Sequence, residues 1–151
     1  MLLSELVPPE CVVIPMIATD KPGAIGELVQ RLVDRSGGSY DDAYRAVVRR
    51  EQELSTGIGF GVAIPHGKSA TVRDLTVVAG VAAAPVPFDS LDGQPVRLFF
   101  LIVGPEATAG QHVKVLSRIA RLVRHGDVRE RLVCAGTPED FLRALLDAEE
   151  R

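Results

Sequence analysis

Residues 75–103 read LTVVAGVAAAPVPFDSLDGQPVRLFFLIV, two long apolar runs separated by a turn. The runs at 75–86 and 96–103 are rich in valine and other strand-forming residues, and they are too continuous for strands with one exposed face. They therefore predict interior strands of a sheet. The turn Ser-Leu-Asp-Gly at 90–93 between them is short, which favours at least one antiparallel pair. At this point the pattern leaves open whether the whole sheet is parallel or mixed.

Amphipathic helical patterns lie on both sides of these runs. Before them, Asp20 and Ser39 stand at the N-cap positions of two segments with apolar residues at helical spacing. After them, residues 109–124 predict a long amphipathic helix and Asp127 begins a shorter one. Thr137 is expected to cap the last helix. Helices are thus expected on either side of the strands in sequence.

Two shorter apolar runs predict further strands. Residues 11–17 contain Pro15, which confines that strand to a sheet edge or a bulge, and residues 62–64 predict a brief strand that Pro65 ends. Strands that interleave with helices indicate an α/β fold, in which a sheet is covered by helices on both faces.

The composition is that of an ordinary globular protein and excludes several classes of function. A length of 151 residues predicts one domain, and a net charge of −3 argues against a nucleic-acid partner. Because no apolar window approaches the length of a spanning helix, we expect no membrane insertion. Cys11 and Cys134 lack metal-type spacing and are expected to be small buried apolar residues, which favours a reducing, cytoplasmic location.

The glycine-rich segment STGIGFGVAIPHGKS, residues 55–69, ends in Gly-Lys-Ser as a nucleotide-binding P-loop does. However, five residues separate Gly61 from Gly67, and Pro65 removes a backbone donor that a phosphate cradle needs. The chain also continues into a strand, whereas both the P-loop and the dinucleotide fingerprint lead into a helix. These features argue against a nucleotide site, and we expect no cofactor and no metal.

The same segment contains a candidate nucleophile, His66. Pro65 stiffens the chain on one side, and Gly67 is expected to leave the imidazole open on the other. A neutral imidazole can attack phosphorus without a separate base, which suits covalent catalysis. The spacing alone leaves open a second interpretation, a histidine that caps or packs within a tight turn.

The segment STGIGFGVAIPHGK, residues 55–68, resembles the active-site signature of the type-2 enzyme IIA domains of the bacterial phosphoenolpyruvate-dependent phosphotransferase system (PTS). This family includes the fructose/mannitol and nitrogen-regulatory branches. LLSELVPPECVV at 2–13, FDSLDGQPV at 88–96 and QHVKVLSRIARLV at 111–123 are similar to further family segments. The resemblance implies a single domain over residues 1–151, with a mixed β-sheet flanked by helices on both faces.

The resemblance also implies roles for three residues. His66 would be the phosphoacceptor of a phosphotransferase, receiving a phosphoryl group from an HPr-like phosphocarrier protein. Arg50 corresponds to the family's arginine and could hold two phosphoryl oxygens, although Arg49 beside it is an alternative. His112, at the start of its helix, corresponds to the family's second histidine and could donate a hydrogen bond to the phosphoryl group or to His66.

Three neighbouring positions add to this expectation. Lys68 and Ser69 could supply a positive charge and a hydroxyl to the phosphoryl group. Phe60 stands where the family most often has asparagine. Its ring could pack under the loop or widen a docking surface, so the substitution leaves the identity of the partner open. We expect it to reduce phosphoryl transfer only if the ring obstructs the approach to His66.

Three functions fit these residues. The chain could relay phosphoryl groups, bind a regulatory target protein in a phosphorylation-dependent manner, or keep the fold without transfer. The presence of His66, Arg50 and His112 together argues against the last. A domain with no fused permease favours a nitrogen-type regulatory role. The alternative is the IIA component of a fructose/mannitol-type sugar transport system, which passes phosphate to a IIB domain. The sequence names no sugar and no oligomeric state.

Overall fold

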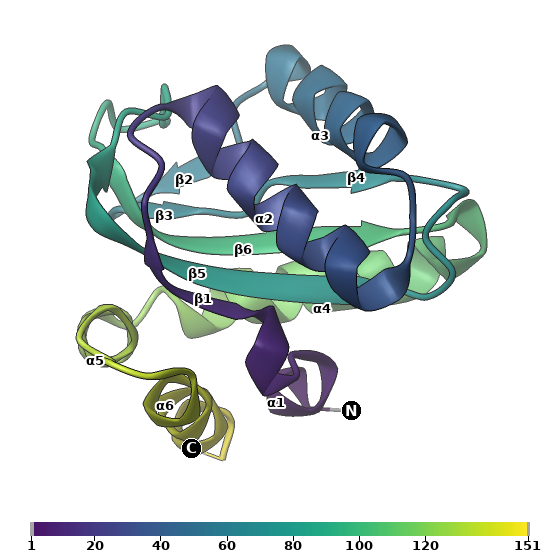
Figure 1. Cartoon of the computed structure of the whole chain (residues 1–151). Coiled ribbons are helices and arrows are strands. Elements are labelled where there is room, and N and C mark those ends of the chain that lie inside the picture. Colours follow the sequence, from purple (N-terminus) through teal and green to yellow (C-terminus); the bar gives the residue numbers. More distant parts are fainter. Residues whose placement is uncertain (1, 151) are drawn as a thin grey trace.

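A six-stranded sheet lies at the centre of the structure, a computed structural model that describes residues 2–150 (Figure 1). The strands are β1 (Val12–Met16), β2 (Gly57–Gly59), β3 (Val62–Ala63), β4 (His66–Lys68), β5 (Thr76–Val86) and β6 (Val96–Gly104). Their order is β1-β5-β6-β3-β2, and β4 also pairs with β6. The pairs β5–β6 and β2–β3 are antiparallel, and the other pairs are parallel. The sheet is therefore mixed, and the predicted antiparallel pair is confirmed.

Helices cover both faces of this sheet, as predicted. They are α1 (Leu3–Leu6), α2 (Lys21–Ser36), α3 (Tyr40–Glu53), α4 (Ala109–Leu122), α5 (Gly126–Val133) and α6 (Pro138–Glu149), with short 3-10 helices at Pro9–Cys11 and Glu106–Thr108. Figure 1 shows α2 and α3 on one face and α4 with α5 and α6 on the other. The predicted caps Asp20, Ser39 and Thr137 each accept a hydrogen bond from a backbone N–H three residues on.

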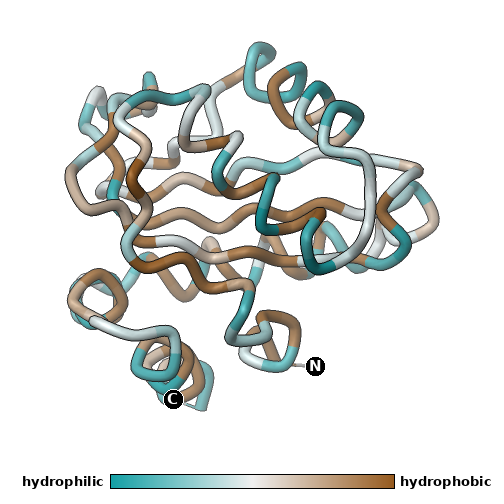
Figure 2. Tube along the Cα trace, in the orientation of Figure 1, coloured by the Kyte–Doolittle hydropathy of each residue, from teal (hydrophilic) through white to brown (hydrophobic). Residues whose placement is uncertain are grey.

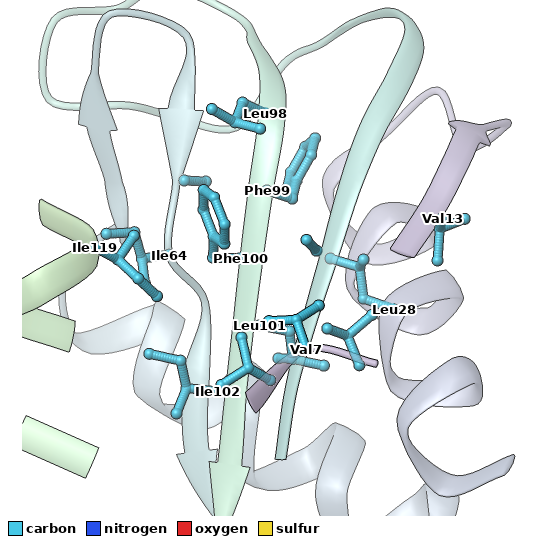
Figure 3. Close-up of a cluster of buried hydrophobic side chains, with 14 of the residues drawn as sticks. Val7, Val13, Leu28, Ile64, Leu98, Phe99, Phe100, Leu101, Ile102 and Ile119 are labelled. Carbon is cyan, nitrogen blue, oxygen red and sulfur yellow. The ribbon is translucent and has the colours of Figure 1, made fainter. Parts of the chain in front are cut away.

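Strand β6 forms the middle of the core. Its residues are buried except for the partly exposed Arg97, because β5 lies on one side and β3 with β4 on the other. Figure 3 shows successive side chains from Leu98 to Ile102 pointing to opposite faces, and Figure 2 shows the hydrophobic residues concentrated along the central strands. Burial on both faces explains why the sequence of this strand is an unbroken apolar run. Strand β1, which contains Pro15, lies at the sheet edge as predicted.

Several expectations need correction. The glycine-rich segment contains a strand that the sequence pattern did not indicate, because Gly57–Gly59 forms β2. A Cβ atom at Gly57 would clash with the Ser90 hydroxyl, so glycine permits close packing here. Pro65 ends β3 as predicted, but the chain resumes at once as β4, which the sequence pattern did not indicate. Cys11 is buried as expected, whereas Cys134 is exposed at the end of α5.

Candidate functional site

His66 is the first residue of β4 and is held in place from its backbone and from its ring. The N–H of Ile102 on β6 donates to the Pro65 carbonyl at 3.0 Å. The Nδ1 atom of His66 lies 2.9 Å from the Ile64 carbonyl oxygen. Because a carbonyl only accepts hydrogen bonds, this contact places the ring proton on Nδ1 and leaves the lone pair on Nε2. The partly exposed imidazole is thus oriented as a nucleophile.

Gly67 has a second role beside the expected one of leaving space next to the imidazole. A Cβ atom at this position would lie 2.9 Å from the Val47 nitrogen and 3.0 Å from the Ala46 carbonyl carbon, both in the backbone of α3. Glycine therefore lets β4 pack directly against α3, which lies over it in Figure 1. Side chains alternate along a strand, so His66 points away from α3, toward the face covered by α4. The glycine positions the strand, and its value is not limited to leaving space beside the imidazole.

His112 on α4 meets His66 edge to face, with ring centroids 5.2 Å apart and an interplanar angle of 70°. It is buried although it lies in the first turn of its helix. Burial, followed by the charges of His66 and Lys68, lowers the pKa of His112 to about 4. Burial also lowers the pKa of His66, helped by the charges of Arg50 and Lys68 and opposed by the Ile64 contact and Glu51. Both rings are therefore neutral near pH 7.

Arg50 lies in the last turn of α3, and its Nη1 donates to the Leu54 carbonyl at 2.9 Å. It is half-buried, and its charge is near enough to lower the pKa of His66. Arg49 is exposed on the same helix. The structure thus brings Arg50 and His112 to His66, and it leaves Arg49 toward solvent.

Lys68 and Ser69, although adjacent in sequence, lie in different surroundings. Lys68 is two residues from His66 along β4, and its Nζ lies 3.8 Å from the Glu106 carboxylate. Ser69 is buried, and its hydroxyl donates to Asp42 in the first turn of α3. Lys68 therefore contributes positive charge to the site, whereas Ser69 ties β4 to α3 and is not placed to contact a phosphoryl group.

Phe60 lies at the tip of the β2–β3 turn, away from His66. The carbonyl of Gly61, next to it, accepts a hydrogen bond from Leu98 on β6, while that of Pro65 accepts one from Ile102. These contacts are four residues apart on β6, about 13 Å at the rise of a strand. The Phe60 ring is 72% exposed and lies under the Arg129 guanidinium at 4.6 Å, so it does not pack under the loop. It also does not obstruct the approach to His66.

Two buried polar residues beside the site, Glu51 and Thr56, were not predicted from the sequence. The Glu51 carboxylate accepts hydrogen bonds from the backbone N–H and the hydroxyl of Thr56, and it pairs with Lys21 at 2.8 Å. A signal was available, because residues 43, 47 and 51 share one helical face and the first two are apolar. A carboxylate on the core-facing side of a helix needs buried partners.

Residues 2–150 contain neither a cluster of metal-ligand side chains nor a membrane-spanning helix. No group of three or more histidine, cysteine, aspartate or glutamate residues there is close enough to hold a metal ion. None of the helices in this part of the chain is both long and apolar enough to span a membrane.

The sequence and the fold are similar to those of known proteins. Residues 5–148 match the sequence model of the family described as "Phosphoenolpyruvate-dependent sugar phosphotransferase system, EIIA 2". A nitrogen regulatory protein of Bradyrhizobium diazoefficiens is 35% identical over 132 residues, covering 87% of this chain and 86% of that protein. A fructose-specific EIIA component of a PTS from Haloferax volcanii is 35% identical over 151 residues, covering 98% and 97%. The crystal structure of the nitrogen regulatory protein IIA-Ntr from Neisseria meningitidis superposes with a TM-score of 0.88 at 34% identity, covering 95% of this chain and 98% of that one.

Proposed function

The chain belongs to the type-2 EIIA family of phosphoenolpyruvate-dependent sugar phosphotransferase systems, and from this premise we propose that it carries a phosphoryl group on Nε2 of His66. The observation that supports this most directly is the contact between Nδ1 of His66 and the Ile64 carbonyl. It leaves Nε2 as the nitrogen with a free lone pair. The donor would be the phosphohistidine of an HPr-like phosphocarrier protein.

The proposed step is a transfer of phosphorus between two imidazoles. Nε2 of His66 attacks the phosphorus atom, an N–P bond forms, and the N–P bond to the donor ring breaks with its electron pair returning to that ring. The proton stays on Nδ1 of His66, hydrogen-bonded to the Ile64 carbonyl, so no base is needed. A proton on the second nitrogen of the donor ring lets that ring leave as neutral imidazole. Catalysis of such a loose transition state depends on positioning and on charge stabilisation.

Arg50 and His112 would supply that stabilisation. The planar guanidinium of Arg50 can donate two parallel hydrogen bonds to phosphoryl oxygens. His112 lies 5.2 Å from His66 between ring centroids and is neutral, so it can donate one N–H without adding a charge to the empty site. Lys68 adds a further positive charge near both rings.

We place the phosphorylated protein in nitrogen-type regulation or relay. The nitrogen regulatory relatives support this reading, at 35% identity to one protein and a TM-score of 0.88 to another. The second candidate is a IIA component of a fructose/mannitol-type transport system that passes phosphate to a IIB domain. The fructose-specific relative favours it, because the match covers 98% of this chain.

The experiment is phosphorylation in a reconstituted system. The protein is incubated with phosphoenolpyruvate, enzyme I and HPr-type carriers, and its intact mass is measured before and after acid treatment. We expect an acid-labile gain of one phosphoryl group that disappears in His66→Ala. No gain in the wild type with several carriers would exclude both candidate functions. A gain that persists in His66→Ala would move the phosphoacceptor to another residue.

A second measurement separates the two candidates. The phosphorylated protein is mixed with a purified IIB domain, and phosphate is followed by mass on both proteins. Retention of the phosphoryl group, with selective capture of a soluble regulatory target by one phosphorylation state, supports the regulatory function. Rapid transfer to the IIB domain supports the transport function.

A further inference from the structure

A continuous path of hydrogen bonds links the buried carboxylate of Glu51 to the ring of His66. Glu51 accepts the backbone N–H of Thr56 with both oxygens at 3.0 Å, and it accepts the Thr56 hydroxyl as well. The Thr56 carbonyl accepts the N–H of Ile64 at 3.0 Å. The Ile64 carbonyl is the group that accepts the Nδ1 proton of His66, at 2.9 Å. Thr56 therefore connects the end of α3 to Ile64, which lies two residues before the nucleophile.

The same turn also positions the arginine. Arg50 donates to the Leu54 carbonyl, and Leu54 is the residue at which α3 ends. Thr56 follows two residues later and is tied back to Glu51 within the last turn of α3. Glu51 thus stabilises the turn whose Leu54 carbonyl accepts the hydrogen bond of Arg50. Thr56 links the same turn to His66 through Ile64.

Glu51 is held as a carboxylate in this arrangement. It is buried, and Lys21 on α2 lies 2.8 Å away. Burial raises the pKa of Glu51, but hydrogen bonds from Lys21, Thr56 and Ser55 outweigh it, so that the pKa lies below its usual value. A buried ion pair that also accepts several hydrogen bonds is costly to disturb at one partner only. Such a network fixes one geometry of the turn.

We propose that Glu51 and Thr56 are positioning residues, which hold the Nδ1–H tautomer of His66 and the orientation of Arg50 through the turn at 54–57. Neither residue touches the phosphoryl group in this arrangement. The role in catalysis depends on the proposed phosphoryl transfer at His66. The role in holding the tautomer is a property of the unphosphorylated protein and can be measured without any donor.

Different variants test the hydroxyl of Thr56 and the charge of Glu51. Thr56→Val removes the hydroxyl and keeps the backbone N–H and carbonyl, whereas Thr56→Ser restores the hydroxyl. Glu51→Gln keeps the size of the side chain and removes its charge. Glu53→Gln is the matched control, because Glu53 is an exposed glutamate in the last turn of the same helix.

The first readout is the tautomer of His66, observed by ¹⁵N NMR of the imidazole nitrogens in the unphosphorylated protein. Wild type, Thr56→Ser and Glu53→Gln are expected to show Nδ1–H as the dominant form. Glu51→Gln and Thr56→Val are expected to show a mixture of the two tautomers. If both keep the wild-type tautomer, the positioning role is overturned.

The second readout is the rate of phosphoryl transfer from the HPr-type carrier, with kcat and KM measured separately. A misplacement within the site of about 1 Å can cost on the order of a hundredfold in rate, so we expect kcat to fall about tenfold or more in Glu51→Gln. The kcat of Thr56→Val should lie between those of Glu51→Gln and the wild type. The kcat of Thr56→Ser should stay within about twofold of the wild-type value. KM should be unchanged, because both residues are buried. A loss confined to KM, or equal losses in Thr56→Ser and Thr56→Val, contradicts the proposal.

These outcomes are distinct from failure of the proposed function. A wild-type protein that accepts no phosphoryl group removes the transfer reaction, while the tautomer measurement still tests the positioning. If Glu51→Gln does not fold, Thr56→Val decides the matter, because it leaves the pair of Lys21 and Glu51 intact.

Discussion

At His66, one hydrogen bond selects which nitrogen is available for chemistry. The Ile64 carbonyl holds the Nδ1 proton, and the neighbouring charges together with burial lower the pKa of the ring. A neutral ring with a free Nε2 lone pair is the form that can attack phosphorus. The Pro-His-Gly pattern alone left open a histidine that packs within a turn, and the resemblance of residues 55–68 to a known signature made this residue the candidate nucleophile. The hydrogen bond itself depends on the path of the backbone between β3 and β4, which no spacing in the sequence reveals.

Arg50 and Arg49 provide a matched pair for testing the role of charge at the site. Arg50 is half-buried beside His66, and Arg49 is exposed on the same helix. We expect Arg50→Ala to slow phosphoryl transfer by about a hundredfold or more, because it removes charge stabilisation from the transition state. Arg49→Ala should change the rate by less than about threefold, the range of a weak surface charge. Rapid-quench measurements on both variants check this, and equal losses would contradict the assignment of Arg50.

Some residues of the site were predicted from the sequence and some were not, for a physical reason. His66, Arg50 and His112 lie in segments that resemble a known family, so their places followed from the pattern. Thr56 carries no signal in the sequence, and Glu51 is marked there only by its place on the apolar face of its helix; the burial of both is seen in the structure. Ser69 is the opposite case, a residue that the sequence suggested for the site and that the structure assigns elsewhere. Its position after Gly-Lys suggested phosphate binding, but its hydroxyl donates a hydrogen bond to Asp42.

Among the elements of the fold, β4 was the hardest to predict from the sequence. Three residues after a proline carry no periodic signal, and β4 exists because its backbone pairs in parallel with β6 and packs under α3. The long runs that became β5 and β6 were predicted closely, since burial on both faces, along β6 and along residues 77–82 of β5, leaves a continuous apolar pattern. Short strands that depend on tertiary contacts are not visible in this way.

Gly67→Ala tests the contact between β4 and α3. The added methyl group would meet backbone atoms of Ala46 and Val47 at 3.0 and 2.9 Å, so the strand or the helix must shift. We expect the free energy of unfolding to fall by about 1–3 kcal/mol, as overpacking of a core contact does. Urea denaturation measures it.

Gly110→Ala is the control for this substitution. The residue lies in α4, and beyond its chain neighbours and its own helix backbone no described atom lies within 4 Å of the place that a Cβ would occupy. The added methyl group therefore meets open space. The variant should be neutral or stabilising by up to about 1 kcal/mol. A loss of stability equal to that of Gly67→Ala would show that the contact with α3 is not the cause.

Phe60→Asn tests the turn between β2 and β3. Phe60 has a φ angle of 59°, between two glycines that also have positive φ. A left-handed residue other than glycine or asparagine costs about 1–2 kcal/mol, and an exposed cation–π contact such as that with Arg129 contributes about 0.5–1 kcal/mol. We expect Phe60→Asn to leave the free energy of unfolding unchanged or to raise it by up to about 1 kcal/mol.

Two comparisons sharpen the Phe60 experiment. Phe60→Ala loses the cation–π contact and gains none of the left-handed preference of asparagine, so it should unfold at a lower urea concentration than Phe60→Asn. Both variants should keep the wild-type rate of phosphoryl transfer, because the turn lies about 13 Å along β6 from His66. A large change in rate with either variant would place Phe60 in the docking of the carrier.

For the whole molecule, the buried histidines make stability depend on pH. The pKa of His112 is lowered to about 4 by burial first, so the unfolded chain binds a proton at this residue more readily than the folded chain. The contribution of His112 to the free energy of unfolding is therefore fully present above pH 6.5, and it is lost as the pH falls from there toward 4. The loss from His112 amounts to up to about 3 kcal/mol. His66 shifts in the same direction.

Urea unfolding at a series of pH values measures this dependence. The free energy of unfolding of the wild type should fall steadily between pH 6.5 and pH 4, and the curve for His112→Gln should be flatter over the same range. Equal slopes for the two proteins would show that folding does not lower the pKa of His112.

The attachment of β4 to both α3 and β6 has a consequence for how a partner could tell the phosphorylated protein from the unphosphorylated one. A strand pinned on both sides has little freedom to move when its first residue is modified, so the shape of the surface should stay nearly constant while its local charge changes by about two units. Such a signal is screened by salt, in contrast to a signal carried by a moving segment. The ratio of a partner's affinities for the two forms, measured from about 50 mM to about 500 mM salt, should therefore shrink toward one. A ratio that is independent of salt would require a rearrangement of the backbone around His66.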